Sequence, residues 1–191
     1  MSAARSGVLR VLLTAFPAVL LLPPVRAWLE ATMTRQMLLQ IPLVIAAGWW
    51  LAALLPRAWH RRVSAWNPGG VAGLVLAVAL GGVVMTPRVL DAATYSAGAD
   101  ALKLACAFGC GVAAGASWRP AGIPGQAFVV GNIAWMLAAS GVLLRDWPQR
   151  VCAAYLEQDQ RIAGTGLVLW ALVLSALWLV PQLRRRRASP L

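Results

Sequence analysis

The sequence predicts an all-α, polytopic membrane protein that forms one bundle of about six transmembrane helices. Of its 191 residues, 60% are hydrophobic and only 12% are charged. A soluble domain of this size cannot bury so much apolar surface, so the bilayer is the expected solvent. The apolar residues also gather in separate segments, most of them close to the ~20 residues that cross the hydrocarbon core as a helix.

The predicted spans belong to a single domain, residues 1–191, and cover residues 8–22, 36–55, 69–86, 99–118, 125–144 and 162–180. Residues 184–191 form a basic tail. Proline interrupts the first two spans, and Pro17 and Pro42 are expected to kink helices rather than end them. The first span is short, and Val25-Arg26-Ala27 resembles a small-residue cleavage site. This segment is therefore either a retained helix, which the prolines favour, or a cleaved signal peptide.

The charges set the orientation of the bundle. With six crossings, one side holds both termini, ten basic residues and no acid. The other side holds seven basic residues and all six acids, Glu30, Asp91, Asp100, Asp146, Glu157 and Asp159. The positive-inside rule then places both termini in the cytoplasm of a bacterium whose inner membrane the protein crosses. Most tryptophans fall near the two predicted membrane surfaces, whereas Trp135 and Trp170 fall deeper and are expected to pack between helices.

The composition excludes most catalytic classes. There is a single histidine, His60, and the sequence contains no HExxH, GxSxG or phosphate-binding glycine loop. We therefore expect no enzyme activity. The net charge of +11 lies in short loops between apolar segments, which indicates membrane topology and interaction with lipid rather than nucleic-acid binding. Three irregularly spaced cysteines do not form a disulfide framework.

Soft ligands are the chemistry that remains. Met33, Gln36, Met37 and Gln40 follow i, i+3, i+4, i+7 spacing and share one helical face. Thioether and thiolate ligands select Cu(I), so the candidate metal ligands are Met33, Met37, Met85, Asp91, Cys106 and Cys110. Buried cysteine and methionine more often serve as packing residues, and this alternative stays open. Lys103 lies one turn before Cys106, and it is either a functional group or a side chain that reaches up to Asp100 or Asp91.

Three short stretches resemble the CtaG-like cytochrome c oxidase assembly factors, a family of multi-helix membrane proteins linked to copper-site maturation. The first is Met33-Thr34-Arg35-Gln36-Met37-Leu38-Leu39, where the family has His-Met-x-Gln-His-Leu-Leu. The second is Pro87-Arg88-Val89-Leu90-Asp91-Ala92-Ala93, which is similar to Pro-x-Leu-Tyr-Asp-Ala-Ala. The third is Glu157-Gln158-Asp159-Gln160-Arg161-Ile162-Ala163-Gly164, which is similar to Asp-Gln-x-x-Ala-Gly. The family's histidines are replaced here, at Met33 and Met37 in the first stretch and near Ala99 and Lys103 in a later helix.

The resemblance implies a non-catalytic membrane factor for assembly of a respiratory haem-copper oxidase, with Cu(I) handling at the outer face. The replaced histidines support an alternative, a metal-free accessory or structural subunit of a larger respiratory or redox complex. A small-molecule transporter is a third reading, with only Asn132 and Lys103 as midplane polar groups. The partner complex and the oligomeric state do not follow from the sequence.

Overall fold

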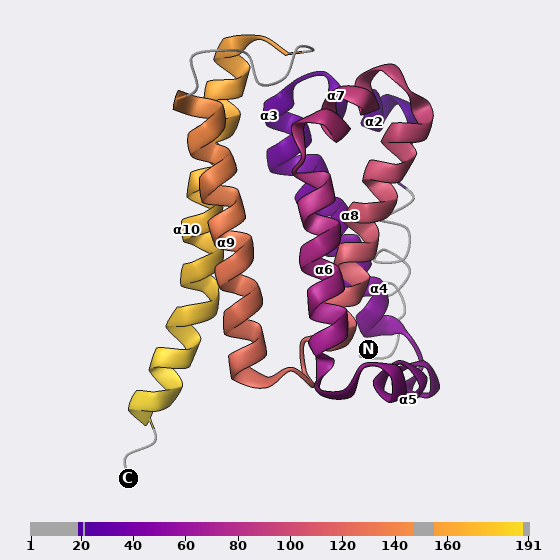
Figure 1. Cartoon of the computed structure of the whole chain (residues 1–191), viewed down its shortest axis with the longest axis vertical. Coiled ribbons are helices and arrows are strands. Elements are labelled where there is room, and N and C mark those ends of the chain that lie inside the picture. The colour runs from indigo at the N-terminus through magenta and orange to yellow at the C-terminus, as the bar shows by residue number, and fades with distance from the viewer. Residues whose placement is uncertain (1–18, 21, 147–154, 189–191) are drawn as a thin grey trace, which may run out of the picture.

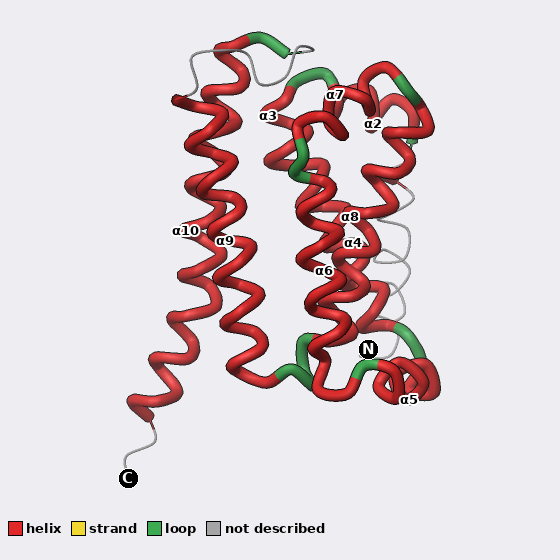
Figure 2. The backbone as a smooth tube through the Cα atoms, in the orientation of Figure 1, coloured by secondary structure: helices red, strands yellow, loops and turns green. Residues whose placement is uncertain are grey.

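A computed structural model describes residues 19–20, 22–146 and 155–188. Every regular element in these residues is a helix (Figure 2). The predicted all-α class is therefore confirmed for the described part of the chain. The first predicted span, residues 8–22, lies almost entirely outside it.

The chain passes repeatedly along one axis (Figure 1). A short helix at one end, α2 (Pro23–Glu30), precedes a longer helix formed by α3 (Met33–Arg35), a π-helical turn (Gln36–Gln40) and α4 (Ile41–Leu54). Helix α5 (Arg57–Trp66) lies across the opposite end, and a 3-10 turn (Pro68–Gly70) leads into α6 (Val71–Val84). Helix α7 (Pro87–Tyr95) lies across the first end. Three long helices follow: α8 (Ala97–Ser117), α9 (Gly122–Asp146) and α10 (Glu157–Ala188).

Four of these helices are long and apolar enough to cross a membrane: Met33–Leu54, Ala97–Ser117, Gly122–Asp146 and Glu157–Arg185. The helical segments Ala58–Trp66 and Pro68–Val84 meet at a bend of 70° and would add a fifth span if they count as one. The structure thus has four or five candidate spans. They coincide with the last five predicted spans, and the predicted span 69–86 is the one that depends on the bent pair. A sixth crossing and the orientation of the termini remain predictions.

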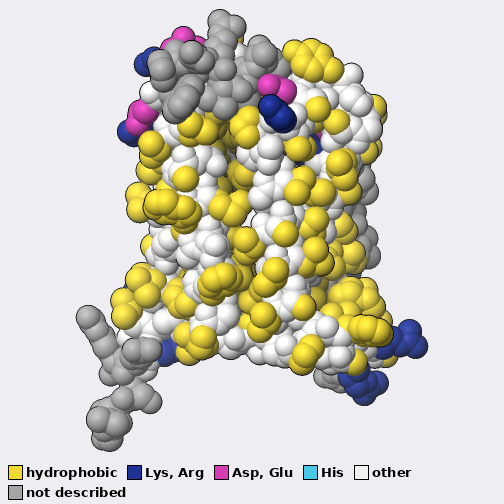
Figure 3. Space-filling view, viewed as in Figure 1, with side chains coloured by type: hydrophobic (Ala, Val, Ile, Leu, Met, Phe, Trp, Pro, Cys, Tyr) yellow, Lys and Arg dark blue, Asp and Glu magenta, His cyan; other side chains and the backbone are white. Residues whose placement is uncertain are grey.

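The two ends of the bundle differ in charge. All six acidic residues of the chain lie on α2, α7, the first turns of α8 and α10, and the last turn of α9. We call this the acidic end, and Figure 3 shows acidic side chains only there. The opposite end, the arginine end, carries α5, Arg119 and the end of α10. The charge segregation predicted from the sequence is confirmed as a property of the folded bundle.

The π-helical turn explains how Pro42 fits near the start of a membrane helix. A proline lacks an amide N–H, and its ring clashes with the carbonyl group four residues earlier in a regular α-helix. That carbonyl belongs to Leu38, which lies within the π-helical turn. In this turn the backbone hydrogen bonds reach back five residues instead of four, so Pro42 follows a segment that departs from regular α-helical geometry. Met33, Gln36, Met37 and Gln40 are all at most 3% exposed, so their predicted shared face is confirmed and is turned into the protein.

Glycine brings two pairs of helices into close contact. A Cβ atom on Gly111 of α8 would collide with the carbonyl oxygen of Ile45 on α4, and one on Gly48 would collide with that of Phe108. Between α9 and α10, a Cβ on Gly141 would lie 2.6 Å from the carbonyl oxygen of Gly164. Small residues of this kind let membrane helices approach closely. The bundle therefore consists of a group formed by α4, α6 and α8 and a hairpin formed by α9 and α10 (Figure 1).

One of the two deep tryptophans, Trp135, does not pack between helices as predicted, whereas Trp170 lines the space between the two helix groups. Trp135 is 72% exposed and Trp170 is 39% exposed. Trp135 lies on the outer surface of the α9–α10 hairpin, where lipid is the expected neighbour. Hydropathy predicts how deep a residue lies in the membrane. It does not predict whether the side chain points towards lipid or towards a neighbouring helix, because that depends on how the helices pack.

Candidate functional site

A buried cluster of charged side chains lies at the acidic end. Lys103 of α8 is fully buried, and its Nζ lies 2.6 Å from Oδ1 of Asp100 on the preceding turn. Asp100 also pairs with Arg26 of α2. Nζ of Lys103 lies 3.8 Å from Oε1 of Glu30, which is also on α2. The expectation that Lys103 reaches up to Asp100 is thus confirmed, although the ammonium group does not emerge into solvent.

Gln40 completes this cluster from the π-helical turn. Its amide Nε2 donates a hydrogen bond to Oε1 of Glu30 at 2.8 Å, and its Oε1 accepts one from Lys103 Nζ at 3.4 Å. Two cations and two carboxylates make the cluster neutral overall. Burial of charge is tolerated only when the charges are paired in this way. Asp100 is therefore already neutralised by Arg26 and Lys103, and the cluster fastens α2 to α8 and to the start of the second predicted span.

Asp159 joins the two helix groups at the acidic end. Its Oδ2 accepts a hydrogen bond from the backbone N–H of Met33 at 2.5 Å, and its Oδ1 accepts from the Thr34 hydroxyl. The first N–H groups of a helix lack intrahelical partners and attract negative charge. Nearby, the Tyr155 hydroxyl donates to Oε1 of Gln36 at 2.9 Å. Asp159 and Tyr155 thereby hold the start of α10 against the first turns of the helix that contains α4.

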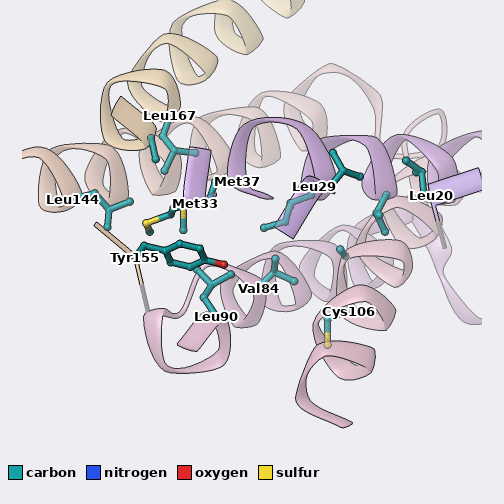
Figure 4. Close-up of a cluster of buried hydrophobic side chains, with 14 residues drawn as sticks. Leu20, Leu29, Met33, Met37, Val84, Leu90, Cys106, Leu144, Tyr155 and Leu167 are labelled. Atoms are coloured by element: carbon teal, nitrogen blue, oxygen red, sulfur yellow. The ribbon is translucent and has the colours of Figure 1, made fainter. Parts of the chain in front are cut away.

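The methionines predicted as an outer metal site lie in the hydrophobic core. Met33 is fully buried and Met37 is 3% exposed, and they pack in a cluster with Leu90, Leu144 and Leu167 (Figure 4). Met85, at the end of α6, packs against the same cluster. Cys106 also belongs to it but lies well apart from the methionine side chains (Figure 4).

A groove runs between the two helix groups. It has a volume of about 630 Å³, within the usual range for ligand sites in proteins, and its lining is almost entirely apolar. Four sulfur-containing side chains from four different segments line it: Met37, Met85, Cys110 and Met136. Towards the arginine end the lining becomes rich in tryptophan, with Trp49, Trp50, Trp118 and Trp178.

Two of these sulfur-containing side chains pack next to glycine residues of α6. A Cβ atom on Gly81 would lie 3.8 Å from Sγ of Cys110, and one on Gly82 would lie 3.8 Å from Cε of Met136. Both glycines are on α6, so Cys110 of α8 and Met136 of α9 approach α6 at neighbouring positions. Cys110 is buried and carries a free thiol. Four polarizable sulfur atoms therefore border one cavity inside an apolar bundle.

The structure separates the predicted metal ligands into two sets. Met37, Met85 and Cys110 line the groove, whereas Met33 and Cys106 are buried without lining it. Asp91 lies on α7, and its Oδ1 is buried with no hydrogen-bond partner among the described residues. Met136 was not predicted, because nothing in its sequence context distinguishes it from other apolar residues of its span. It is the last methionine of the chain, and residue type alone was the available signal.

No protein-family model, curated protein or solved structure matches this chain. The resemblance to the CtaG-like family accordingly remains a hypothesis that rests on three short stretches of sequence. The chemistry of the site has to be argued from its own residues.

Those residues favour a soft ligand. Among residues 19–20, 22–146 and 155–188, no three His, Cys, Asp or Glu side chains form a group that could hold a metal ion. The groove instead has three thioether side chains and one thiol in its lining. Hard cations such as Mg²⁺ and Ca²⁺ prefer oxygen ligands, while Cu(I) prefers thiolate and thioether. The donor set fits Cu(I), and no arrangement of nucleophile and base appears beside it in the described residues.

Proposed function

We propose that this protein is a non-catalytic membrane factor that handles Cu(I) during assembly of a respiratory haem-copper oxidase. The observation that carries the copper part is the groove bordered by Met37, Met85, Met136 and Cys110. A soft cation inside a bilayer needs ligands that neutralise it or solvate it without water. One thiolate and neutral thioethers meet that need for a monovalent ion.

The oxidase part of the proposal rests on sequence resemblance. Gln36, Asp91, Asp159 and Gln160 stand where the CtaG-like motifs have the same residue types. Two of them make hydrogen bonds that hold the helices together. Gln36 accepts a hydrogen bond from the Tyr155 hydroxyl, and Asp159 caps the helix that starts at Met33. These contacts support a shared fold around a site whose ligands differ. The partner would meet the bundle within the membrane or at the acidic end.

We propose that the acidic end faces the outside of the bacterial inner membrane. The arginine end carries no acid, and cytoplasmic loops are the ones enriched in arginine and lysine. Together with a sixth crossing by residues 8–22, this orientation places both termini in the cytoplasm. Met37 and Met85 then lie at the outer ends of their helices, whereas Cys110 and Met136 lie deeper along theirs.

A metal-free accessory subunit is the second candidate, and one observation favours it. Large apolar side chains are exposed along both helix groups, among them Leu102, Phe128 and Leu172. Such faces suit either lipid or the helices of a larger complex. On this reading the sulfur atoms of the groove serve only as adaptable packing residues.

The deciding experiment measures Cu(I) binding by competition with a chromogenic chelator, on the full-length protein purified under reducing conditions. Cys110→Ser and the double variant Met85→Leu with Met136→Leu change groove residues. Cys106→Ser and Met33→Leu are matched controls, because they change the same residue types outside the groove. Methionine-to-leucine changes conserve volume and keep the core packed.

Near-stoichiometric Cu(I) in the parent protein, weakened by at least about tenfold in the groove variants and unchanged in the controls, would support the proposal. A tenfold change corresponds to the loss of about 1.4 kcal/mol of binding free energy. Failure of the parent protein to bind Cu(I), or equal weakening in groove and control variants, would refute it. Stable, stoichiometric co-purification with a respiratory complex without copper would favour the accessory subunit.

A further inference from the structure

A second cavity lies at the arginine end, on the other side of two groove tryptophans. It has a volume of about 610 Å³ and is bordered by α5 and by the ends of α4 and α8. Its polar lining consists of His60, Arg61, Ser64, Asn67 and Arg119, and we call it the basic pocket. Trp49 and Trp118 line both cavities and meet edge to face, with ring centroids 5.2 Å apart.

The basic pocket has no negative charge near it. All six acids of the chain lie at the acidic end. On α8, Asp100 lies 17 residues before Ser117, the last residue of the helix and a neighbour of the pocket. This separation is about 25 Å along the helix axis. The ion pairs among the described residues are all at the acidic end as well. Arg61 and Arg119 therefore have no carboxylate partner among the residues that the structure describes, and the complementary ligand is an anion.

The pocket lies where a membrane surface would be. Helix α5 lies across the end of the bundle at the foot of the candidate spans α4 and α8 (Figure 1). Trp59, Val63 and Trp66 follow i, i+4, i+7 spacing on one face of α5, and Trp66 is 89% exposed. Arg61 lies on the opposite face of α5, whereas Arg62 lies beside Trp66. A short helix with tryptophan on one side and arginine on the other is suited to the headgroup layer.

We propose that the basic pocket binds the phosphate headgroup of an anionic phospholipid from the leaflet at the arginine end. Arg61 and Arg119 form charge-assisted hydrogen bonds to the phosphate oxygens, for which the planar guanidinium group is well suited. His60 and the Ser64 hydroxyl, which now donates to the Arg61 carbonyl at 2.9 Å, are further donors. The indole rings of Trp49 and Trp118 contact the glycerol region and the start of the acyl chains.

Asn67 has a different task in this site. Its amide Nδ2 donates to Ser117 Oγ at 2.8 Å, and its Oδ1 accepts from the Gly73 N–H at 3.0 Å. Its hydrogen-bonding groups are thus committed within the protein. Asn67 holds the start of α6 against the end of α8, and this contact sets the width of the pocket.

The test is native mass spectrometry of the full-length protein in mixed micelles that contain equal amounts of phosphatidylglycerol and phosphatidylcholine. The pocket variant is Arg61→Gln with Arg119→Gln. The matched control is Arg62→Gln with Arg185→Gln, which removes the same charge from the same end without touching the pocket lining. Arg119→Gln alone is a milder variant, for use if the double variant unfolds on heating before the parent protein does.

The expected result is retention of phosphatidylglycerol over phosphatidylcholine by the parent and control proteins. The pocket variant should retain at least about tenfold less, because one charge-assisted hydrogen bond is worth roughly that factor. Equal loss in the pocket and control variants would show a diffuse effect of charge and overturn the proposal. Displacement of the lipid by glycerol 1-phosphate at equal concentration would also overturn it, in favour of a soluble anion. The copper proposal is unaffected by either result, because it rests on groove residues that these variants leave intact.

Discussion

Lys103 and Asp100 form an ion pair on successive turns of α8, with 2.6 Å between Nζ and Oδ1 and neither side chain more than 2% exposed. The pair lies inside a candidate membrane span, where charged side chains are expensive. Arg26 and Glu30 extend it across to α2 and balance its charge. These ion pairs connect α2 to α8, the helix that carries Cys110 in the groove and Cys106 in the core.

The first prediction concerns this balance of charge. Lys103→Met leaves two carboxylates facing Arg26 alone, and breaking a buried pair usually costs about 3 kcal/mol or more. We expect the apparent melting temperature in detergent to fall. Lys103→Met with Asp100→Asn restores neutrality, since Arg26 and Glu30 remain as a pair, and should recover most of the loss. Additive losses in the double variant would contradict the idea that the charges are coupled.

The second prediction concerns the contact between the helix groups. Asp159→Ala removes the acceptor for the Met33 N–H and the Thr34 hydroxyl, and loss of a helix cap costs about 1–2 kcal/mol. Hydrogen exchange around residues 32–36 should accelerate. Glu157→Ala is the matched control, because its ion pair with Arg161 is largely exposed and exposed pairs contribute little. Equal exchange in both variants would show that Asp159 does not hold the two groups together.

The third prediction concerns the seam between α4 and α8. Gly111→Ala places a Cβ atom against the Ile45 carbonyl, so the two helices must separate and the protein should melt at a lower temperature. Gly131 of α9 offers a matched control, because a Cβ there meets nothing within 4 Å. Gly131→Ala should be neutral or stabilising, since alanine favours a helix by up to about 1 kcal/mol over glycine. Similar melting of the two variants would refute close packing at Gly111.

Hydropathy and charge predicted the parts of this fold that depend on the solvent. The four or five candidate spans and the separation of all six acids from the arginine end follow from the cost of placing polar groups in a bilayer. Helices α2 and α7 were not predicted. Both are short, begin with proline and lie in segments that the sequence places in loops between the predicted spans. The ion pair between Asp100 and Arg26 was not predicted for the same reason. Arg26 reaches it only because α2 folds back onto α8.

The sulfur-lined groove shows a second limit of sequence analysis. Spacing along one helix can relate Cys106 to Cys110, but it cannot relate either residue to another helix. Cys110, Met85 and Met136 line one groove because α6, α8 and α9 pack side by side, which spacing along a single helix does not show. Met33 has the same residue type as Met37, and each replaces a histidine of the resembled motif. Both side chains belong to the same buried cluster, but Met33 lies one turn nearer the acidic end and does not line the groove.

The last prediction concerns orientation. In a protein whose three cysteines are replaced by serine, Tyr95→Cys and Ala65→Cys place single thiols at exposed sites on α7 and α5, at opposite ends of the bundle. A membrane-impermeant maleimide added to intact spheroplasts should label Tyr95→Cys and leave Ala65→Cys unlabelled until the cells are broken. The reason is that arginine-rich loops are retained in the cytoplasm during insertion. The reverse pattern would place the arginine end outside and remove the basis for a cytoplasmic-leaflet lipid in the basic pocket. It would also place Met37 and Met85, at the acidic ends of their helices, next to the cytoplasm, so copper would enter the groove from that side.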